Sequence, residues 1–269
     1  MRPLTFGKPA LRYKAAGARN ERVGARMSIH IHYLEPGAAV DDAAALEQFQ
    51  TQWATYQKMV DHDSLSHQEV GAILHLALAA LPKPFDFLDI ACGDAGQMKR
   101  ALEGTKARHY RGIDLSEPAL DLAAKNLAGA PFAVELDDGD FVEALSNQPK
   151  PADVTWCGLS IHHLSTDGKR KLLGAICGAT RDVAMIYEPT LAEGEDREAY
   201  LARFRRVNRP AWTFLTDEEW SQIDHHVTTC DLPEHAATWL ALGREAGFSK
   251  ASQIFLDPTG FYGLYRYDR

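Results

Sequence analysis

The segment from Phe85 to Gly96 constrains the fold more than any other part of the sequence. It reads Phe-Asp-Phe-Leu-Asp-Ile-Ala-Cys-Gly-Asp-Ala-Gly, an apolar strand with Asp89 near its end and then a tight turn of small residues. A second apolar stretch ends in Asp114, 25 positions after Asp89. Small residues let the backbone approach a ligand, and an acid about 20 residues beyond a glycine turn is typical of ribose binding. The two segments predict a nucleotide-type ligand at the carboxyl ends of parallel strands.

Strand and helix patterns alternate from residue 85 onward. We expect strands near 85–91, 108–114, 131–136, 152–159 and 182–188, with helices near 96–104, 117–128, 139–147 and 167–179. Such alternation produces a parallel sheet, with right-handed crossovers and helices on both faces. A last helix, 235–246, precedes a hairpin of residues 251–256 and 261–267, so the final strand should run antiparallel.

Two amphipathic helices are expected before the first strand. Residues 41–61 carry apolar side chains at helical spacing. A second helix should begin after Ser66, which forms a capping-box pattern with Glu69, and should end before Pro82.

The connection from Pro189 to Pro233 is far longer than an ordinary strand-to-helix loop. Residues 192–206 can be helical, and Thr216 with Glu219 repeats the capping-box pattern before another helix. Ligands of open α/β sheets bind outside the carboxyl ends of the strands, where this connection leaves the sheet. We therefore expect it to form a lid over a second ligand, with the N-terminal helices as the other wall.

Charge is distributed unevenly along the chain. The net charge is −8, yet the first 26 residues carry seven basic side chains against Glu21 alone, so the remainder is more acidic than the total suggests. An acidic body repels phosphate backbones, which argues against nucleic acid as a partner. No apolar run approaches the ~18 residues of a membrane span. The four cysteines are far apart, which fits a reduced, cytoplasmic location without a disulfide framework.

These observations predict the organisation of the chain. We expect a basic, disordered leader over residues 1–27, a helical cap over 28–84, and a ligand-binding domain over 85–269 with the lid insertion at about 190–233.

Four motifs occur in an order that resembles the class I S-adenosylmethionine (SAM)-dependent methyltransferases, over roughly residues 60–269. They are Asp89-x-Ala91-x-Gly93-x-Ala95-Gly96, Asp114-Leu115-Ser116, Gly139-Asp140-Phe141, and the strand 152–159 with His162-His163-Leu164 after it. In the first motif alanine replaces two of the family's three glycines, although Gly96 keeps the turn small. The resemblance implies an α/β, Rossmann-like class I methyltransferase sheet, mostly parallel with an antiparallel last strand, a helical N-terminal segment and a helical lid insertion.

The resemblance also implies SAM as the cofactor. Asp114 would bind the ribose, and Asp140 would accept a hydrogen bond from the adenine amino group, with Asp137 and Asp138 as competitors for that role. The residues expected to bind the cofactor are Asp89, Ala91, Gly93, Gly96, Asp114, Leu115, Asp140, Phe141 and Leu159.

His162 and His163 follow the strand whose end the family places nearest the transferring methyl group. One of them could act as a general base, because imidazole titrates in the useful range. The alternative is that the pair only shapes the pocket.

Tyr56, Arg203, Arg206 and Trp212 are the candidates for contact with the methyl acceptor. Guanidinium groups beside aromatic walls suit a planar or carboxylate-bearing small molecule. The arginines between residues 203 and 209 could equally form a solvated helix face that nearby acids balance.

Four residues of the insertion are of types that can bind a metal ion: Asp224, His225, His226 and Asp231. Adjacent histidines rarely bind one ion together, and no His-x-x-x-His spacing exists. The sequence therefore favours a polar lid segment and no metal.

The resemblance implies methyl transfer to an oxygen or nitrogen of a small molecule. A second hypothesis is a regulatory or partner protein that binds SAM or S-adenosylhomocysteine (SAH) without turnover. A closed, aromatic acceptor cavity would favour the enzyme, and an open cofactor cleft would favour the binding protein. A nicotinamide dehydrogenase is disfavoured by Asp89 inside the turn motif and by the terminal hairpin.

Overall fold

The computed structural model describes residues 11–14, 53–139, 144–145 and 150–269. The predicted helix over residues 41–61 therefore falls partly outside the described residues, of which 53–61 are helical. Most of the predicted helix 139–147 also lies outside them, and so do Asp140 and Phe141.

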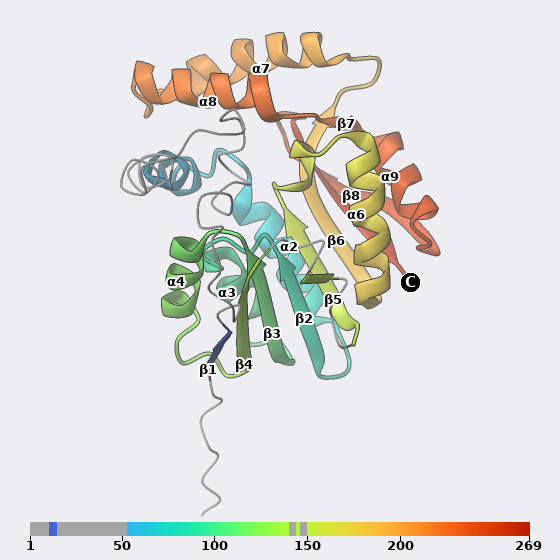
Figure 1. The fold of residues 1–269 in the computed structure, drawn as a ribbon. Helices are drawn as coiled ribbons and strands as arrows, with labels where there is room; N and C mark the ends of the chain where they lie inside the picture. The colour runs from blue at the N-terminus through green and yellow to red at the C-terminus, as the bar shows by residue number, and fades with distance from the viewer. Residues whose placement is uncertain (1–10, 15–52, 140–143, 146–149) are drawn as a thin grey trace, which may run out of the picture.

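The described strands form one mostly parallel sheet in the order β1-β4-β3-β2-β5-β6-β9-β8 (Figure 1). The strands are β1 (Leu11–Lys14), β2 (Phe85–Ile90), β3 (Ala107–Asp114), β4 (Ala133–Asp138), β5 (Ala152–Gly158), β6 (Thr180–Leu191), β8 (Lys250–Leu256) and β9 (Tyr262–Asp268), while the short β7 (Glu234–His235) pairs with β6. Only β9 runs antiparallel to its neighbours, β6 and β8. This arrangement confirms the predicted Rossmann-like fold with an antiparallel last strand.

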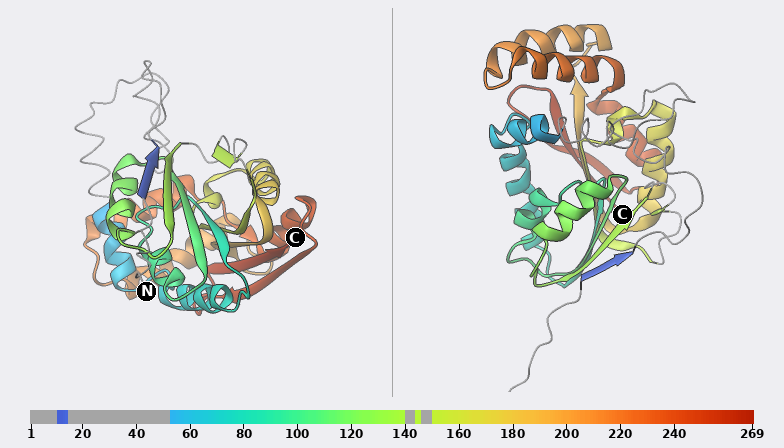
Figure 2. Two further views of the ribbon diagram at one scale, coloured as in Figure 1. Left: turned by 90° about the horizontal axis from the view of Figure 1, so that it is seen from below. Right: turned by 60° about the vertical axis from the view of Figure 1, so that its left-hand side comes forward.

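Helices cover both faces of the sheet. The helices are α2 (His67–Ala79), α3 (Gly96–Leu102), α4 (Glu117–Asn126), the 3-10 turn η2 (Ile161–His163), α6 (Thr166–Ala179), α7 (Arg197–Ala211), α8 (Asp217–Cys230) and α9 (Ala236–Glu245). Buried side chains of α2, α3 and α4 share one apolar cluster with β2 and β3. Those of α6 and α9 form a second cluster on the other face. The result is a three-layer α/β/α domain (Figure 2).

The two helices of the insertion, α7 and α8, lie side by side across the carboxyl ends of the strands (Figures 1 and 2). Thr216 and Glu219 make the predicted capping box, because each side chain accepts from the other residue's backbone N–H. Helix α7 begins at Arg197, five residues later than predicted, because the side chain of Asp196 accepts a hydrogen bond from Ala199 N and caps it. The long connection thus has its own helical structure.

Two local predictions are wrong. Ser66 precedes α2 but has a left-handed backbone, with φ of 52°, and makes no capping bond. Asp63 takes over part of this role, since its Oδ1 accepts from Gln68 N at 2.9 Å. Within the predicted disordered leader, residues 11–14 form β1, which pairs in parallel with β4 at the sheet edge. The rest of the leader lies outside the described residues.

None of the described helices is both long enough and apolar enough to span a bilayer.

Candidate active site

In the turn after β2, three alternate residues have a left-handed backbone conformation. Ala91, Gly93 and Ala95 have φ of 55°, 53° and 53°. Alanine is strained there by roughly 1–2 kcal/mol, because its Cβ approaches the following carbonyl oxygen. Bonds within the protein hold the turn in this shape: Cys92 N donates to Ile113 O, and Ala95 N donates to Cys92 O.

Asp114 fixes this turn from the end of β3. Its Oδ2 accepts from Gly93 N at 2.8 Å, and its Oδ1 accepts from Ser116 N at 2.9 Å. Each carboxylate oxygen retains acceptor capacity beyond that one bond. The predicted ribose-binding acid is therefore placed and oriented by the turn itself.

The turn also lies very close to β3. A Cβ on Gly112 would stand 2.8 Å from Cys92 Sγ, 3.0 Å from the Leu136 side chain and 3.0 Å from the Tyr110 ring. Real Cβ contacts are longer than this, so only glycine allows the turn to pack at this distance.

Asp89 is buried beneath the turn. Tyr110 Oη donates to its Oδ2 at 2.6 Å. Burial raises the pKa of Asp89 to about 8, with smaller contributions from Asp114 and Asp94, while the Tyr110 bond opposes the rise. A cation placed nearby would favour its ionised form.

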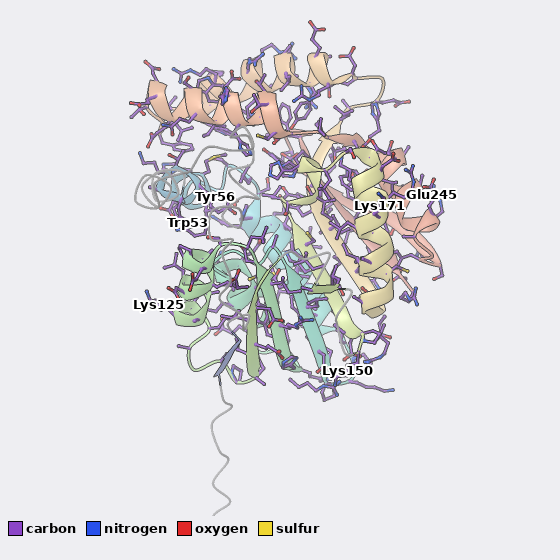
Figure 3. The ribbon with its side chains drawn as sticks, viewed as in Figure 1. Trp53, Tyr56, Lys125, Lys150, Lys171 and Glu245 are labelled. Atoms are coloured by element: carbon purple, nitrogen blue, oxygen red, sulfur yellow. The ribbon has the colours of Figure 1, made fainter. Side chains whose placement is uncertain are left out.

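A single pocket of about 430 Å³ joins the turn to the insertion. Its floor is the turn after β2 and the end of β5, and its roof comes from α7 and α8. A side wall comes from the helical residues 53–61, whose Trp53 and Tyr56 are labelled between α4 and the α7–α8 layer in Figure 3. The volume falls within the range of about 300–1,000 Å³ usual for small-molecule sites.

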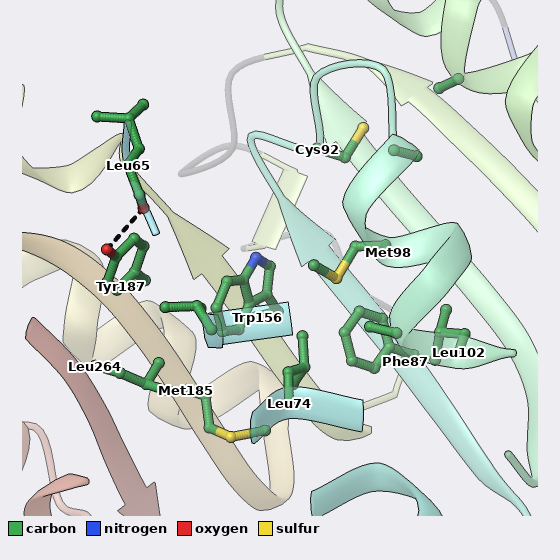
Figure 4. Close-up of a cluster of buried hydrophobic side chains, with 14 of the residues drawn as sticks. Leu65, Leu74, Phe87, Cys92, Met98, Leu102, Trp156, Met185, Tyr187 and Leu264 are labelled. Atoms are coloured by element: carbon green, nitrogen blue, oxygen red, sulfur yellow. Dashed lines mark hydrogen bonds between the residues drawn. The ribbon is translucent and has the colours of Figure 1, made fainter. Parts of the chain in front are cut away.

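The side wall is tied to the sheet by polar bonds. Tyr187 Oη donates to Leu65 O at 2.9 Å (Figure 4), and Tyr56 Oη lies 3.0 Å from His67 Nε2. At the strand ends, Leu159 has φ of 53°, uncommon for a branched residue, while its N–H donates to Tyr187 O at 2.8 Å. These bonds hold the walls of the pocket in register.

Glu188 organises the segment that carries the two histidines. This fully buried carboxylate accepts from the backbone N–H groups of Ser160 at 3.0 Å, Ile161 at 2.8 Å and His162 at 3.2 Å, and lies 2.6 Å from His162 Nδ1. Burial raises the pKa of Glu188 to about 7, although the backbone bonds and Lys169 oppose the rise.

Asp231, at the end of α8, brings the insertion onto the same histidines. Its Oδ1 lies 3.5 Å from His162 Nε2, and 3.7 Å from both His163 Nδ1 and His226 Nε2. Burial raises the pKa of Asp231 to about 8, the charge of Glu188 adds to the rise, and Arg197 opposes it. The pocket therefore ends in a cluster of imidazole and carboxylate groups.

Most of the predicted cofactor residues lie in this one pocket. Those that line it are Asp89, Ala91, Gly93, Gly96, Asp114 and Leu159. Leu115 does not line it, and Asp140 and Phe141 lie outside the described residues. His162, His163, Tyr56 and Trp212 also line it.

The predicted arginine contacts with the acceptor are corrected by the structure. Arg203 binds both carboxylate oxygens of Glu195 at 2.7 Å, and its guanidinium lies 3.9 Å from the centre of the Phe261 ring. Arg205 binds Asp224 at 2.6 Å. Neither these residues nor Arg206 line the pocket. Arg203 and Arg205 thus hold the insertion together, through Glu195 just before α7 and Asp224 on the facing helix α8.

Sequence reasoning missed Glu188 and the position of Asp231. A signal existed for Glu188, since a carboxylate at the end of the apolar run Ala184 to Tyr187 is unusual enough to mark a site. The approach of Asp231 to His162 and His163 gave no comparable signal, because they lie about 70 positions away in the sequence.

One family model matches part of the chain. Residues 87–182 match the family model described as "Methyltransferase domain". Over these residues the chain is similar to a methyltransferase domain, and its sheet has the class I methyltransferase fold.

Solved structures share the fold of this chain at low sequence identity. Magnesium protoporphyrin IX methyltransferase (ChlM) from Synechocystis PCC 6803 with bound SAH has a TM-score of 0.58 and 12% identity, over 85% of this chain and 100% of ChlM. A putative O-methyltransferase from Nostoc punctiforme PCC 73102 has a TM-score of 0.56 and 14% identity, over 82% of this chain and 59% of that protein. The pyocyanin biosynthetic protein PhzM has a TM-score of 0.51 and 20% identity, over 73% of this chain and 54% of PhzM.

The chain spans little more than half the length of PhzM and of the Nostoc protein. The search of curated proteins finds no significant match.

Proposed function

We propose that this protein transfers the methyl group of SAM to an oxygen or nitrogen of an aromatic small molecule. The observation that carries the proposal is the continuity of the pocket, which joins the turn after β2 to an aromatic and histidine-lined space beneath α7 and α8. A cofactor cleft without turnover would not need this second compartment.

In this proposal the cofactor lies over the turn. Asp114 binds the ribose hydroxyls, the small residues of the turn let the backbone approach the ligand, and the positive charge of SAM favours ionised Asp89. Leu159 packs at the strand end beside it. Asp140 and Phe141 remain candidates for the adenine, on the resemblance alone.

The acceptor lies between the turn and the insertion, with helices α7 and α8 acting as its lid. Trp53, Tyr56 and Trp212 supply flat apolar surface for a ring. A carboxylate-bearing acceptor loses its support, because the arginines that motivated it point elsewhere and Asp231 stands at this end.

The chemistry is an in-line displacement. The acceptor lone pair forms a bond to the methyl carbon, the carbon–sulfur bond breaks, and its electron pair remains on sulfur to give SAH. A hydroxyl or ammonium acceptor must also lose a proton, which the proposal assigns to the His162, His163 and Asp231 cluster. Orientation and exclusion of water supply much of the rate enhancement.

The test is SAH release over a panel of aromatic hydroxyls and amines, with SAM alone as the control. We expect SAH release that depends on one class of acceptor, and a loss of turnover of ~10²–10⁴ in His163→Ala with SAM affinity retained. Tight SAM binding without acceptor-dependent SAH would favour a binding protein. Failure to bind SAM or SAH by calorimetry would remove the proposal altogether.

A further inference from the structure

Three imidazoles converge on one buried oxygen of Asp231 at the acceptor end of the pocket; they are those of His162, His163 and His226. His162 Nε2 lies 3.5 Å from Asp231 Oδ1, and His163 Nδ1 lies 3.7 Å from it. Asp231 Oδ1 is buried and makes no hydrogen bond to any group in the described residues. Imidazole nitrogens and a carboxylate oxygen are the ligands that zinc and its neighbours in the periodic table prefer. We propose that His162, His163 and Asp231 bind a divalent transition-metal ion.

The distances fit a metal site. Zinc holds nitrogen and oxygen ligands at about 2.0–2.2 Å, so ligand atoms around a tetrahedral ion stand about 3.3–3.6 Å apart. The two nitrogen-to-oxygen distances, 3.5 Å and 3.7 Å, are already close to this spacing. All three ligand atoms lie within 4.8 Å of one another. Small side-chain rotations would therefore complete the site.

The structure also removes the objection that neighbouring histidines rarely share an ion. His162 and His163 belong to the 3-10 turn η2, and their ring centres lie only 4.0 Å apart. One ring presents Nε2 to Asp231 and the other presents Nδ1. His226 Nε2 stands 3.7 Å from the same oxygen, so it lies beside the remaining coordination position.

Groups behind the ligands hold them in place. When Glu188 is ionised, its contact of 2.6 Å with His162 Nδ1 requires the proton on that nitrogen, which leaves Nε2 as the ligand atom. His162 O accepts from Leu232 N at 2.9 Å. Arg197 Nε donates to Asp231 O at 2.8 Å. These hydrogen bonds hold the ligand residues of η2 and Asp231, just after α8, close together even without an ion.

The role of the ion, but not its binding, rests on the proposed function. A cation here would stand at the acceptor end of the pocket and attract an acceptor oxygen. It would lower the pKa of a hydroxyl, so the proton could pass to water before methyl transfer. With the ion bound, His162, His163 and Asp231 would act as its ligands, and only in the ion-free site would the cluster take the proton itself.

Co²⁺ is the probe for the test, because its visible ligand-field bands report nitrogen and oxygen coordination. The full chain, freed of metal, is titrated with Co²⁺ by absorption and by calorimetry. We expect one equivalent to bind. Asp231→Asn keeps the shape of the side chain but weakens the ligand, and should lower Co²⁺ affinity at least about tenfold, as should His163→Ala. His225→Ala is the matched control, since His225 is an exposed neighbour on α8 and does not line the pocket.

Equal Co²⁺ affinity in the wild type and in the His163→Ala, Asp231→Asn double variant would overturn the inference. So would a loss in His225→Ala as large as the loss in Asp231→Asn. If Asp231→Asn does not fold, His163→Ala carries the test. SAH binding is measured on the same samples, so a failure of the cofactor proposal is seen separately from a failure of the metal site.

Discussion

Replacing Asp114 tests the assignment of the cofactor site most directly. In the structure its two carboxylate oxygens accept from Gly93 N at 2.8 Å and from Ser116 N at 2.9 Å. The proposed ribose contact adds a further charge-assisted hydrogen bond. A bond of that kind contributes about 1.5–3 kcal/mol, so Asp114→Ala should weaken SAM binding by about 10- to 150-fold.

The same substitution should also lower the free energy of unfolding, because Gly93 N and Ser116 N lose their partners. We expect a cost of about 1–3 kcal/mol in the absence of ligand. Asp114→Asn separates the two effects, since its amide oxygen can still accept one backbone N–H but carries no charge. It should retain more stability than affinity.

Calorimetry with SAM and with SAH is the assay, and urea unfolding of the same proteins reports stability. Asp121→Ala is the control, because Asp121 is an exposed carboxylate on α4 outside the pocket lining. SAM affinity in Asp114→Ala within twofold of the wild type, with the fold intact, would refute the role of this carboxylate.

Four further substitutions test stability. The pKa of Asp89 is 3.8 ordinarily and about 8 in the folded protein, so its bound proton stabilises the ligand-free fold fully below pH 4, and this contribution is lost as pH rises through 8. Asp89→Asn should therefore flatten the pH dependence of the free energy of unfolding, measured with urea, between about pH 4 and 8. Parallel pH profiles for the variant and the wild type would contradict this. Gly112→Ala should cost about 1–3 kcal/mol by overpacking against Cys92. Gly174→Ala on α6, where a Cβ meets nothing within 4 Å, should instead stabilise the fold by about 0.5–1 kcal/mol. Urea unfolding of the two glycine variants measures both effects. Thr216→Ala should remove half of the α8 capping box and cost about 1 kcal/mol, and an unchanged melting temperature would show that this cap contributes nothing.

The sequence by itself determined the order of the strands and helices and the position of the turn. Apolar runs that end in Asp89 and Asp114 predict two neighbouring strand ends, because parallel strands with intervening helices bring their carboxyl ends to one edge. The small residues from Ala91 to Gly96 predict a close approach of the backbone for the same local reason. Patterns confined to one element, or to two consecutive elements, are legible in the sequence.

The acceptor end was decided by tertiary structure. Asp231 meets His162 only because α7 and α8 fold back over the strand ends, and nothing local to residue 231 encodes that return. Arg203 was expected in the pocket but faces Glu195 and Phe261, since ion pairing and packing within the insertion determine its direction. Contacts between distant segments depend on how whole elements pack, and hydrophobic periodicity constrains which face is buried but not what it meets.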